Sequence, residues 1–268
     1  MLTVMSDLTR LPRSPLALLC YAAAAAAGAL VAVSFDQALR VHRALREAES
    51  RKPSRPYQYR AVRARKRMLI VGDSTGVGVG AERPTDSIGG LMTAEYRDAE
   101  LVNLSVGGAC IADVLPQLRG LPHDGRRFDL VLLHIGGNDI MRTATLQQAA
   151  LAIDPLLTRL KQLGRRVVWL GPGDIGLAPL FRPPFSWWMS YRTRLACEMF
   201  HRVAAMHRVE YVGFHDGPHR HVLARERHVY FAADGLHPSS QGYRYLYGHL
   251  TRSGALAPLV RVREGATA

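Results

Sequence analysis

Ser74 stands at a position in the sequence where a nucleophile could act. The apolar run from Met68 to Val71 predicts a short buried strand, and the Gly72-Asp73 that follows predicts a sharp turn. Ligands of open α/β sheets bind at the carboxyl ends of the strands, so a serine hydroxyl at this place is a candidate for nucleophilic chemistry. A lone Gly-Asp-Ser turn is more often structural, and the catalytic interpretation therefore needs companion groups.

Three further polar side chains follow predicted strands. Asn138 lies in a Gly-Gly-Asn-Asp turn directly after the apolar run 128–135, and Asp234 and His237 share one tight turn before a helix predicted from about Ser239 to Leu250. An aspartate three residues before a histidine can hold the imidazole through one nitrogen and leave the other nitrogen free. Each turn alone is more often a helix cap or a strand end, but a doubly wound fold would bring all of them to one rim.

The order of apolar and helical stretches predicts an α/β fold. Five strands are expected, near 68–71, 101–104, 128–135, 166–170 and 210–214. Helices are expected over 85–96, capped by Thr85 or Asp86, and over 146–163. Strands separated by helices of this length predict a parallel five-stranded sheet in a doubly wound, three-layer α/β/α fold.

In this order and setting, the four blocks resemble the SGNH, or GDSL-type, hydrolase family over roughly residues 67–252. The resemblance implies the flavodoxin-like SGNH hydrolase fold and a serine esterase or lipase that needs no cofactor and no metal. It implies that Ser74 is the nucleophile and that His237 and Asp234 complete a catalytic triad.

The resemblance also implies an oxyanion hole built from Ser74, Gly108 and Asn138. Gly108 ends an N-x-x-x-x-G turn that begins at Asn103, and Gly107 remains the neighbouring alternative. The residue types suit the chemistry, because a serine hydroxyl needs a base to take its proton and the tetrahedral oxyanion needs donors already aimed at it.

The N-terminal region contains a candidate membrane span. No charge interrupts residues 15–35, which is about the length needed to cross a bilayer. The excess of arginine after this span over Arg10 and Arg13 before it predicts a single-pass anchor with the catalytic domain on the cytoplasmic side. A cleaved signal peptide with Ala27-Gly28-Ala29 near its cleavage site, which would export the domain, and a peripheral helix are the alternatives.

Most of the net charge of +13 lies next to this span. Residues 37–67 hold eleven Lys or Arg against Glu47 and Glu49, a charge of +9, and residues 1–36 are neutral, so +4 remains for the rest. A basic segment beside an apolar helix favours anionic lipid headgroups rather than nucleic acid as the partner. The predicted organisation is a short tail at 1–14, the span at 15–35, a basic tether at 36–66, the hydrolase domain at 67–252 and a tail at 253–268.

The stretch 177–192 should be a loop after the fourth strand, and it concentrates aromatic residues around three prolines. Four of its aromatic residues either pack onto the core or form an acyl-binding wall beside the site: Phe181, Phe185, Trp187 and Trp188. The wall, together with the membrane anchor, would favour a hydrophobic or lipid acyl ester, or a thioester. Removal of acetyl groups from carbohydrates is the alternative within the same family.

Other classes of protein fit the sequence less well. Gly76 to Ala81 match the loose dinucleotide pattern G-x-G-x-x-G/A, but the glycines start late after the strand and no acidic residue ends the second strand. A membrane-tethered binding module without turnover would not need the full Ser/Gly/Asn/His set. Three widely separated cysteines, with no CxxC or Cys/His cluster, argue against a disulfide framework and a zinc site.

Overall fold

The computed structural model describes residues 14–51, 53, 55–121, 125–142 and 145–259. The chain divides into two compact units, Met1–Arg43 and Ala44–Ala268. The predicted tails at 1–14 and 253–268 lie largely outside the described residues.

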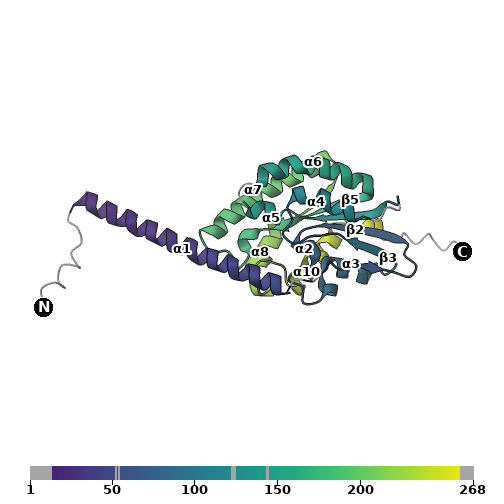
Figure 1. The fold of residues 1–268 in the computed structure, drawn as a ribbon, viewed down its shortest axis with the longest axis horizontal. Coiled ribbons are helices and arrows are strands. Elements are labelled where there is room, and N and C mark those ends of the chain that lie inside the picture. Colours follow the sequence, from purple (N-terminus) through teal and green to yellow (C-terminus); the bar gives the residue numbers. More distant parts are fainter. Residues whose placement is uncertain (1–13, 52, 54, 122–124, 143–144, 260–268) are drawn as a thin grey trace. The chain divides into compact units, whose positions relative to one another are not determined.

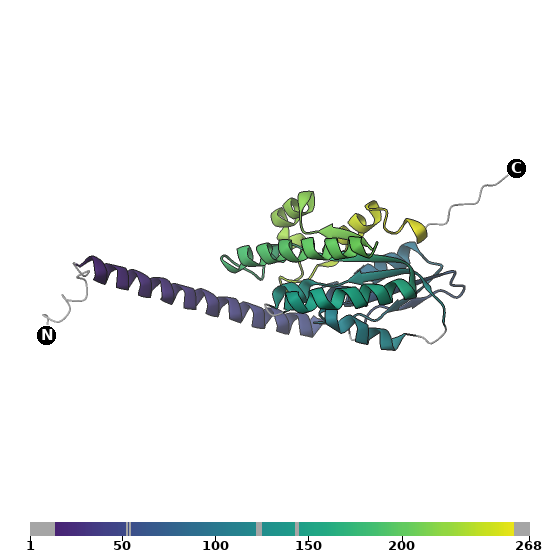
Figure 2. The same ribbon diagram turned by 90° about the horizontal axis from the view of Figure 1, so that it is seen from above.

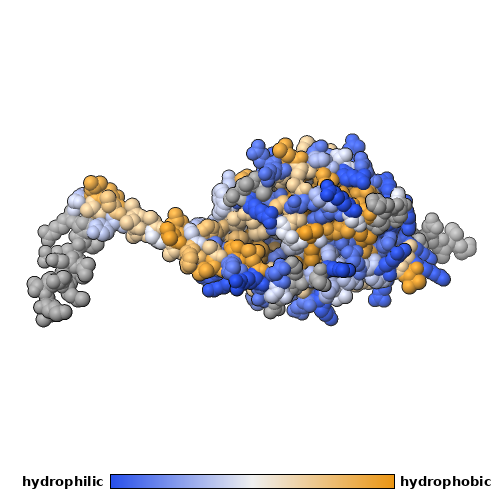
Figure 3. Space-filling model, viewed as in Figure 1, coloured by the Kyte–Doolittle hydropathy of each residue, from blue (hydrophilic) through white to orange (hydrophobic). Residues whose placement is uncertain are grey.

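A long helix, α1, spans Pro15–Arg51 and contains the predicted span 15–35. By length and composition it is apolar enough to cross a membrane, and a signal sequence near the N-terminus would pass the same test. Figure 3 shows apolar and small residues along much of its length. The charged half of this helix covers residues 36–51, the first part of the predicted tether.

The second unit, which contains the predicted hydrolase domain, is built on one six-stranded sheet in the order β1-β3-β2-β4-β5-β6. The strands are β1 (Tyr59–Arg60), β2 (Lys66–Gly72), β3 (Ala99–Asn103), β4 (Phe128–His134), β5 (Gly164–Gly173) and β6 (Glu210–Phe214). The five predicted strands are all present and parallel to one another. The sequence did not predict β1, a two-residue strand in the expected tether that pairs antiparallel with β3 at the sheet edge.

Helices cover both faces of the sheet (Figures 1 and 2). They are α2 (Ser74–Val77), α3 (Ile88–Glu95), α4 (Val114–Gln117), α5 (Gly137–Met141), α6 (Thr145–Leu163), α7 (Phe185–Met206), α8 (Gly217–Arg225), α9 (Arg227–Tyr230) and α10 (Ser240–Arg252). Short 3₁₀ turns lie at Pro84–Asp86, Ile111–Asp113, Leu118–Gly120, Ile175–Leu177 and Ala257–Leu259. The predicted three-layer α/β/α fold is therefore confirmed.

The two faces of the sheet follow the alternation of side chains along each strand. Met68 and Ile70 of β2 belong to a buried cluster with α3, α8 and α10. On the other face, Trp169 of β5 packs against Phe200 of α7 with ring centroids 4.9 Å apart. Because both faces are covered, the middle of each central strand is apolar, and the charged side chains lie near the strand ends.

The first predicted helix begins later than expected. Thr85 and Asp86 form a 3₁₀ turn, and α3 starts at Ile88, where the Ser87 hydroxyl oxygen accepts a hydrogen bond from Gly90 N at 3.2 Å. The carboxylate of Asp86 instead binds Arg83, Ser240 and Arg244, and it is therefore unable to cap the helix.

The predicted aromatic loop is also partly helical. Residues 185–192 form the first two turns of α7, with Pro184 at the N-cap position. A proline at the start of a helix loses no hydrogen bond, because the first N–H groups have no partner inside the helix. The prolines therefore mark the start of this helix, and the loop interpretation of residues 185–192 is wrong.

Candidate active site

Ser74 is the first residue of α2, directly after the turn that ends β2. A side chain at Gly72 would place its Cβ 1.9 Å from the carbonyl oxygen of His134, so β2 and β4 can meet this closely only with glycine there. The Asp73 carboxylate then caps α2, since Oδ1 accepts from Thr75 N at 2.9 Å and from Thr75 Oγ1 at 2.5 Å. This cap fixes the backbone that carries the serine.

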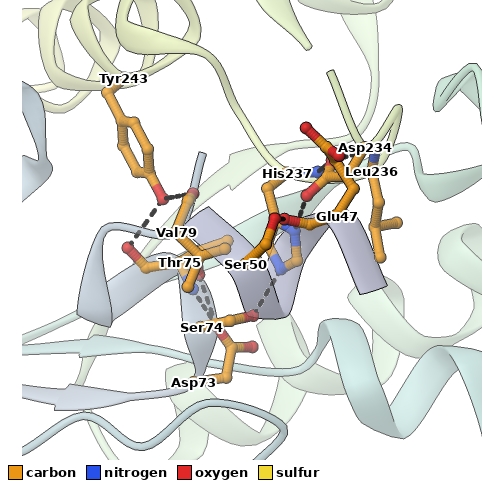
Figure 4. A network of polar contacts seen from close by, with 10 residues as sticks. All are labelled: Glu47, Ser50, Asp73, Ser74, Thr75, Val79, Asp234, Leu236, His237 and Tyr243. Atoms are coloured by element: carbon orange, nitrogen blue, oxygen red, sulfur yellow. Dashed lines mark hydrogen bonds and ion pairs between the residues drawn. The ribbon is translucent and has the colours of Figure 1, made fainter. Parts of the chain in front are cut away.

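A second group of contacts holds α2 from the opposite side. The hydroxyl of Tyr243, in α10, lies 2.7 Å from the carbonyl oxygen of Val79 and 3.2 Å from that of Thr75 (Figure 4). Asn103 Nδ2, at the end of β3, donates to the carbonyl oxygen of Gly76 at 2.9 Å. Tyr243 is fully buried, so α2 is supported by a side chain that the sequence did not single out.

Ser74, His237 and Asp234 form one hydrogen-bonded chain (Figure 4). His237 Nε2 lies 2.8 Å from Ser74 Oγ, and His237 Nδ1 lies 2.6 Å from Asp234 Oδ2. The structure thus joins three residues that are 163 positions apart at the extremes, as the strand-end argument predicted. The contact on Nδ1 leaves Nε2 facing the serine, where a base is needed.

The turn around Asp234 holds its carboxylate in the ionised form. Oδ1 accepts from the backbone N–H groups of Leu236 at 2.8 Å and His237 at 2.9 Å. Burial raises the pKa of Asp234, but the hydrogen bond and charge of His237 and these two N–H groups outweigh it, so the pKa lies below its usual value. Asp234 is therefore a stable anion beside the imidazole.

Gly108, in the chain that follows β3, and Asn138, in α5, each carry hydrogen-bond donors. Gly108 has a φ of 78°, a conformation that favours glycine, and its N–H has no acceptor within the described part of the chain. Asn138, in α5, donates from Nδ2 to the carbonyl oxygen of Ala109 at 2.9 Å. An amide side chain has two N–H bonds, so this contact orients Asn138 and leaves its second N–H for another acceptor.

Side chains near Asn138 hold these two segments together. Arg142, which follows α5, donates to the carbonyl oxygen of Gly108 at 3.1 Å, and both carboxylate oxygens of Asp139 accept from Ile111 N, at 3.1 and 3.3 Å. Neither role was predicted. The Gly-Gly-Asn-Asp sequence indicated Asp139 only as part of a turn, and no feature of the sequence indicated a role for Arg142.

The pKa of Asp139 is raised to about 6, mainly by burial; hydrogen bonds from the N–H groups of Ile111 and Asp139 lower it, and the negative charges of Asp73 and Asp113 contribute to the rise. Between its usual pKa of 3.8 and about 6, the folded protein holds a proton that the unfolded chain has released, so this residue lowers stability as the pH rises through that range. A shift of this size corresponds to at most roughly 3 kcal/mol.

We therefore expect Asp139→Asn to gain stability relative to the wild type as the pH is raised from about 4 to about 7. Asparagine keeps an oxygen acceptor for Ile111 N and carries no charge to bury. Urea unfolding of both proteins at each pH measures the difference. A difference in unfolding free energy that stays constant across this range would show that Asp139 does not titrate there.

The four aromatic residues of the predicted wall have different environments. Phe181 is buried, with 8% of its surface exposed, and Phe185 is partly buried. Trp187 and Trp188 are 69% and 48% exposed on α7. The acyl-binding role of these residues stays a prediction, and only Phe181 packs as a core residue.

The glycines of the loose dinucleotide pattern serve packing around α2. A Cβ at Gly76 would lie 2.3 Å from Ser105 Oγ, and one at Gly80 would lie 2.4 Å from the carbonyl oxygen of Pro238. Each glycine therefore allows a neighbouring segment to approach, which accounts for the pattern without a nucleotide.

Comparison with known proteins agrees with this geometry. Residues 70–245 match the model of the GDSL-like Lipase/Acylhydrolase family, whereas no curated protein matches the sequence. Among solved structures, TesA is 22% identical, with a TM-score of 0.56 over 73% of this chain and 100% of TesA. LAE5, described as an α/β hydrolase enzyme from the metagenome of Lake Arreo, Spain, is 21% identical, with a TM-score of 0.56 over 74% of this chain and 98% of its own.

An acetyl-xylooligosaccharide esterase from Geobacillus, a mutant of Axe2, is also similar. It is 19% identical, with a TM-score of 0.53 over 75% of this chain and 99% of its own. At these identities the solved structures support the fold of the catalytic unit, while the family rests on the sequence model.

Proposed function

Because the chain belongs to the GDSL-like lipase/acylhydrolase family, a family of ester hydrolases, we propose that it hydrolyses a carboxylic ester at Ser74. The observation that carries this proposal is the unbroken chain from Ser74 Oγ through His237 to Asp234, with contacts of 2.8 and 2.6 Å. Such a chain lets a base remove the serine proton while a carboxylate orients that base.

In the proposed reaction, Ser74 Oγ attacks the ester carbonyl carbon while His237 Nε2 takes the hydroxyl proton. Asp234 stabilises the imidazolium that forms. Collapse of the tetrahedral intermediate breaks the bond to the alcohol, which leaves with the proton from His237. Water then attacks the acyl-enzyme with the same histidine as base and releases the carboxylic acid.

The oxyanion of each tetrahedral intermediate would lie among the N–H groups of Ser74 and Gly108 and the side-chain amide of Asn138. Support comes from their positions: Ser74 N–H is at the start of α2, where N–H groups point away from the helix, and Gly108 N–H has no acceptor within the described residues. Donors of this kind typically contribute a few kcal/mol each in the transition state.

For the substrate, we propose a hydrophobic or lipid acyl ester, with a thioester as a variant of the same chemistry. The predicted membrane anchor supports this choice, because it would keep the enzyme beside lipids. The second candidate is an acetylated carbohydrate, and it is supported by the similarity to an acetyl-xylooligosaccharide esterase.

A series of p-nitrophenyl esters from acetyl to palmitoyl, together with an acetylated xylooligosaccharide, separates the two candidates. We expect kcat/KM to rise with chain length, since each buried methylene contributes up to about 0.8 kcal/mol. A maximum at the acetyl ester, together with release of acetate from the oligosaccharide, would favour the carbohydrate esterase.

We also propose that residues 15–35 of α1 remain as a single-pass anchor, with the catalytic unit on the cytoplasmic side. The full chain should then sediment with membranes, resist extraction by high salt and by alkaline carbonate, and dissolve in detergent. N-terminal sequencing of the mature protein tests the alternative. A mature protein that begins near residue 30 would contradict the anchor and would identify a signal peptide and an exported enzyme.

A further inference from the structure

The first half of α7 presents an exposed aromatic stripe, defined as Trp187, Trp188, Tyr191 and Leu195. These side chains are 69%, 48%, 46% and 42% exposed. Their spacing places them on one side of the helix, since residues three, four and seven apart share a face. Apolar side chains are normally exposed singly, so four large ones in a row indicate a contact surface.

The stripe is ordered and is flanked by positive charge. Trp188 and Tyr191 stack with ring centroids 5.9 Å apart. The guanidinium of Arg192 lies 5.9 Å from the ring of Trp188, and that of Arg194 lies 5.6 Å from the ring of Tyr191. Residues 185–197 contain no acidic side chain. Arg192 is buried, so the exposed surface is aromatic and its flanking positive charge is that of Arg194.

Contacts of α7 place this stripe at the rim of the candidate site. Arg192 donates to the carbonyl oxygens of Ile140 at 2.7 Å and Arg142 at 3.1 Å, which ties α7 to the helix of Asn138. Just before α7, Leu180 N donates to the carbonyl oxygen of Gly235 at 2.9 Å, beside Asp234 and His237. The start of α7 therefore adjoins both loops that carry proposed catalytic groups.

We propose that the aromatic stripe of α7 rests on the surface of an anionic bilayer and brings the rim of the active site to the lipid. Tryptophan and tyrosine concentrate at membrane interfaces because their rings are apolar at one end and polar at the other, and arginine beside them attracts anionic headgroups. The inference rests on the proposed membrane anchor, which would tether the chain to a bilayer. An acyl-binding wall and a protein partner are the competing roles for the same residues.

The chain carries its own reporters for the test. It contains three tryptophans, of which Trp169 is fully buried in the core and the other two belong to the stripe. The full chain is reconstituted into vesicles of phosphatidylcholine and phosphatidylglycerol that contain lipids brominated at a shallow or a deep position of the acyl chain. Bromine quenches tryptophan only on close approach, so up to about two thirds of the emission is open to quenching if both exposed tryptophans meet the lipid.

We expect shallow bromine to quench more strongly than deep bromine, and to quench less when phosphatidylglycerol is omitted. The variant Trp187→Phe/Trp188→Phe reports only Trp169 and should lose the quenching. Sedimentation with the vesicles tests the anchor separately: a protein that sediments fully and shows no quenching keeps the anchor and overturns the stripe proposal.

Activity gives an independent readout. Tyr191→Ser/Leu195→Ser should lower hydrolysis of an ester embedded in anionic vesicles at least several-fold and leave hydrolysis of soluble p-nitrophenyl acetate unchanged. Leu151→Ser, an exposed apolar residue of α6, is the matched control and should change neither rate. Rates on vesicle ester that equal wild type in both Tyr191→Ser/Leu195→Ser and Trp187→Phe/Trp188→Phe would likewise overturn the proposal. Absence of quenching with a loss of chain-length preference in Trp187→Ala/Trp188→Ala on soluble esters would assign the tryptophans to an acyl wall instead.

Discussion

Replacing Ser74 with alanine is expected to lower kcat for ester hydrolysis by roughly 10⁴- to 10⁶-fold, as removal of a triad nucleophile does in serine hydrolases. His237 Nε2 loses the only hydroxyl that it contacts among the described residues, and no covalent intermediate can form. The fold should survive, because the side chain of Ser74 makes no other hydrogen bond among the described residues and α2 is capped by Asp73. Steady-state kinetics and a thermal unfolding curve measure the two effects.

Ser105→Ala is the matched control for this variant. Ser105 is a buried serine that follows the neighbouring strand, and its hydroxyl has no hydrogen-bond partner within the described residues. It should retain nearly wild-type kcat. Turnover close to wild type in Ser74→Ala, measured on protein free of host esterases, would remove Ser74 from the mechanism.

Replacing Asn138 with alanine should have the second largest effect, a fall in kcat of about 10²- to 10³-fold with a much smaller change in KM. The side-chain N–H matters most when the carbonyl oxygen becomes an oxyanion, and so its loss raises the barrier more than it weakens substrate binding. Kinetics at saturating and limiting ester concentrations separate the two parameters.

The bond from Asn138 to the carbonyl oxygen of Ala109 makes a second variant necessary, because its loss could shift the Gly108 loop. Arg142→Ala removes the neighbouring bond to the carbonyl oxygen of Gly108 and takes away no oxyanion donor. It should lower kcat much less, by about tenfold at most. Equal losses in the two variants would make Asn138 a loop support, and a change confined to KM would make it a substrate-binding residue.

The sheet could be predicted from the sequence because each central strand is an unbroken apolar run. Leu130 to Leu133 of β4 are all nearly fully buried, and a short continuous apolar run of this kind is typical of a strand that is covered on both faces. Strand β1 could not be predicted, since Tyr59–Arg60 are only two residues and carry no periodicity. The sequence did not predict the cap of α3, because the carboxylate of Asp86 accepts hydrogen bonds from Arg244 and Ser240, which lie more than 150 residues away in the chain.

In the candidate site, too, some residues could be predicted from the sequence and others could not. Ser74, Asn138, Asp234 and His237 were predictable because their types, their order and their places after strands all agree with one reaction. The residues that hold these groups in place could not be predicted. In the sequence, Tyr243 is one of several apolar positions of α10 and has no distinguishing feature. Its hydrogen bond to the carbonyl oxygen of Val79 joins residues that are far apart in the chain, so the sequence gives no sign of it. The start of α7 was hidden because prolines and aromatic residues are as common in loops as at the first turn of a helix.

The central claim is that Ser74 forms a covalent bond with the substrate carbonyl, and a fluorophosphonate probe tests it most directly. The full chain is labelled in detergent, digested, and analysed by mass spectrometry to locate the adduct. Ser74 should carry one phosphonyl group, with no labelling in Ser74→Ala and little in a variant with His237 replaced by alanine. An adduct on another serine, or no adduct in a preparation that still hydrolyses esters, would contradict the proposed mechanism.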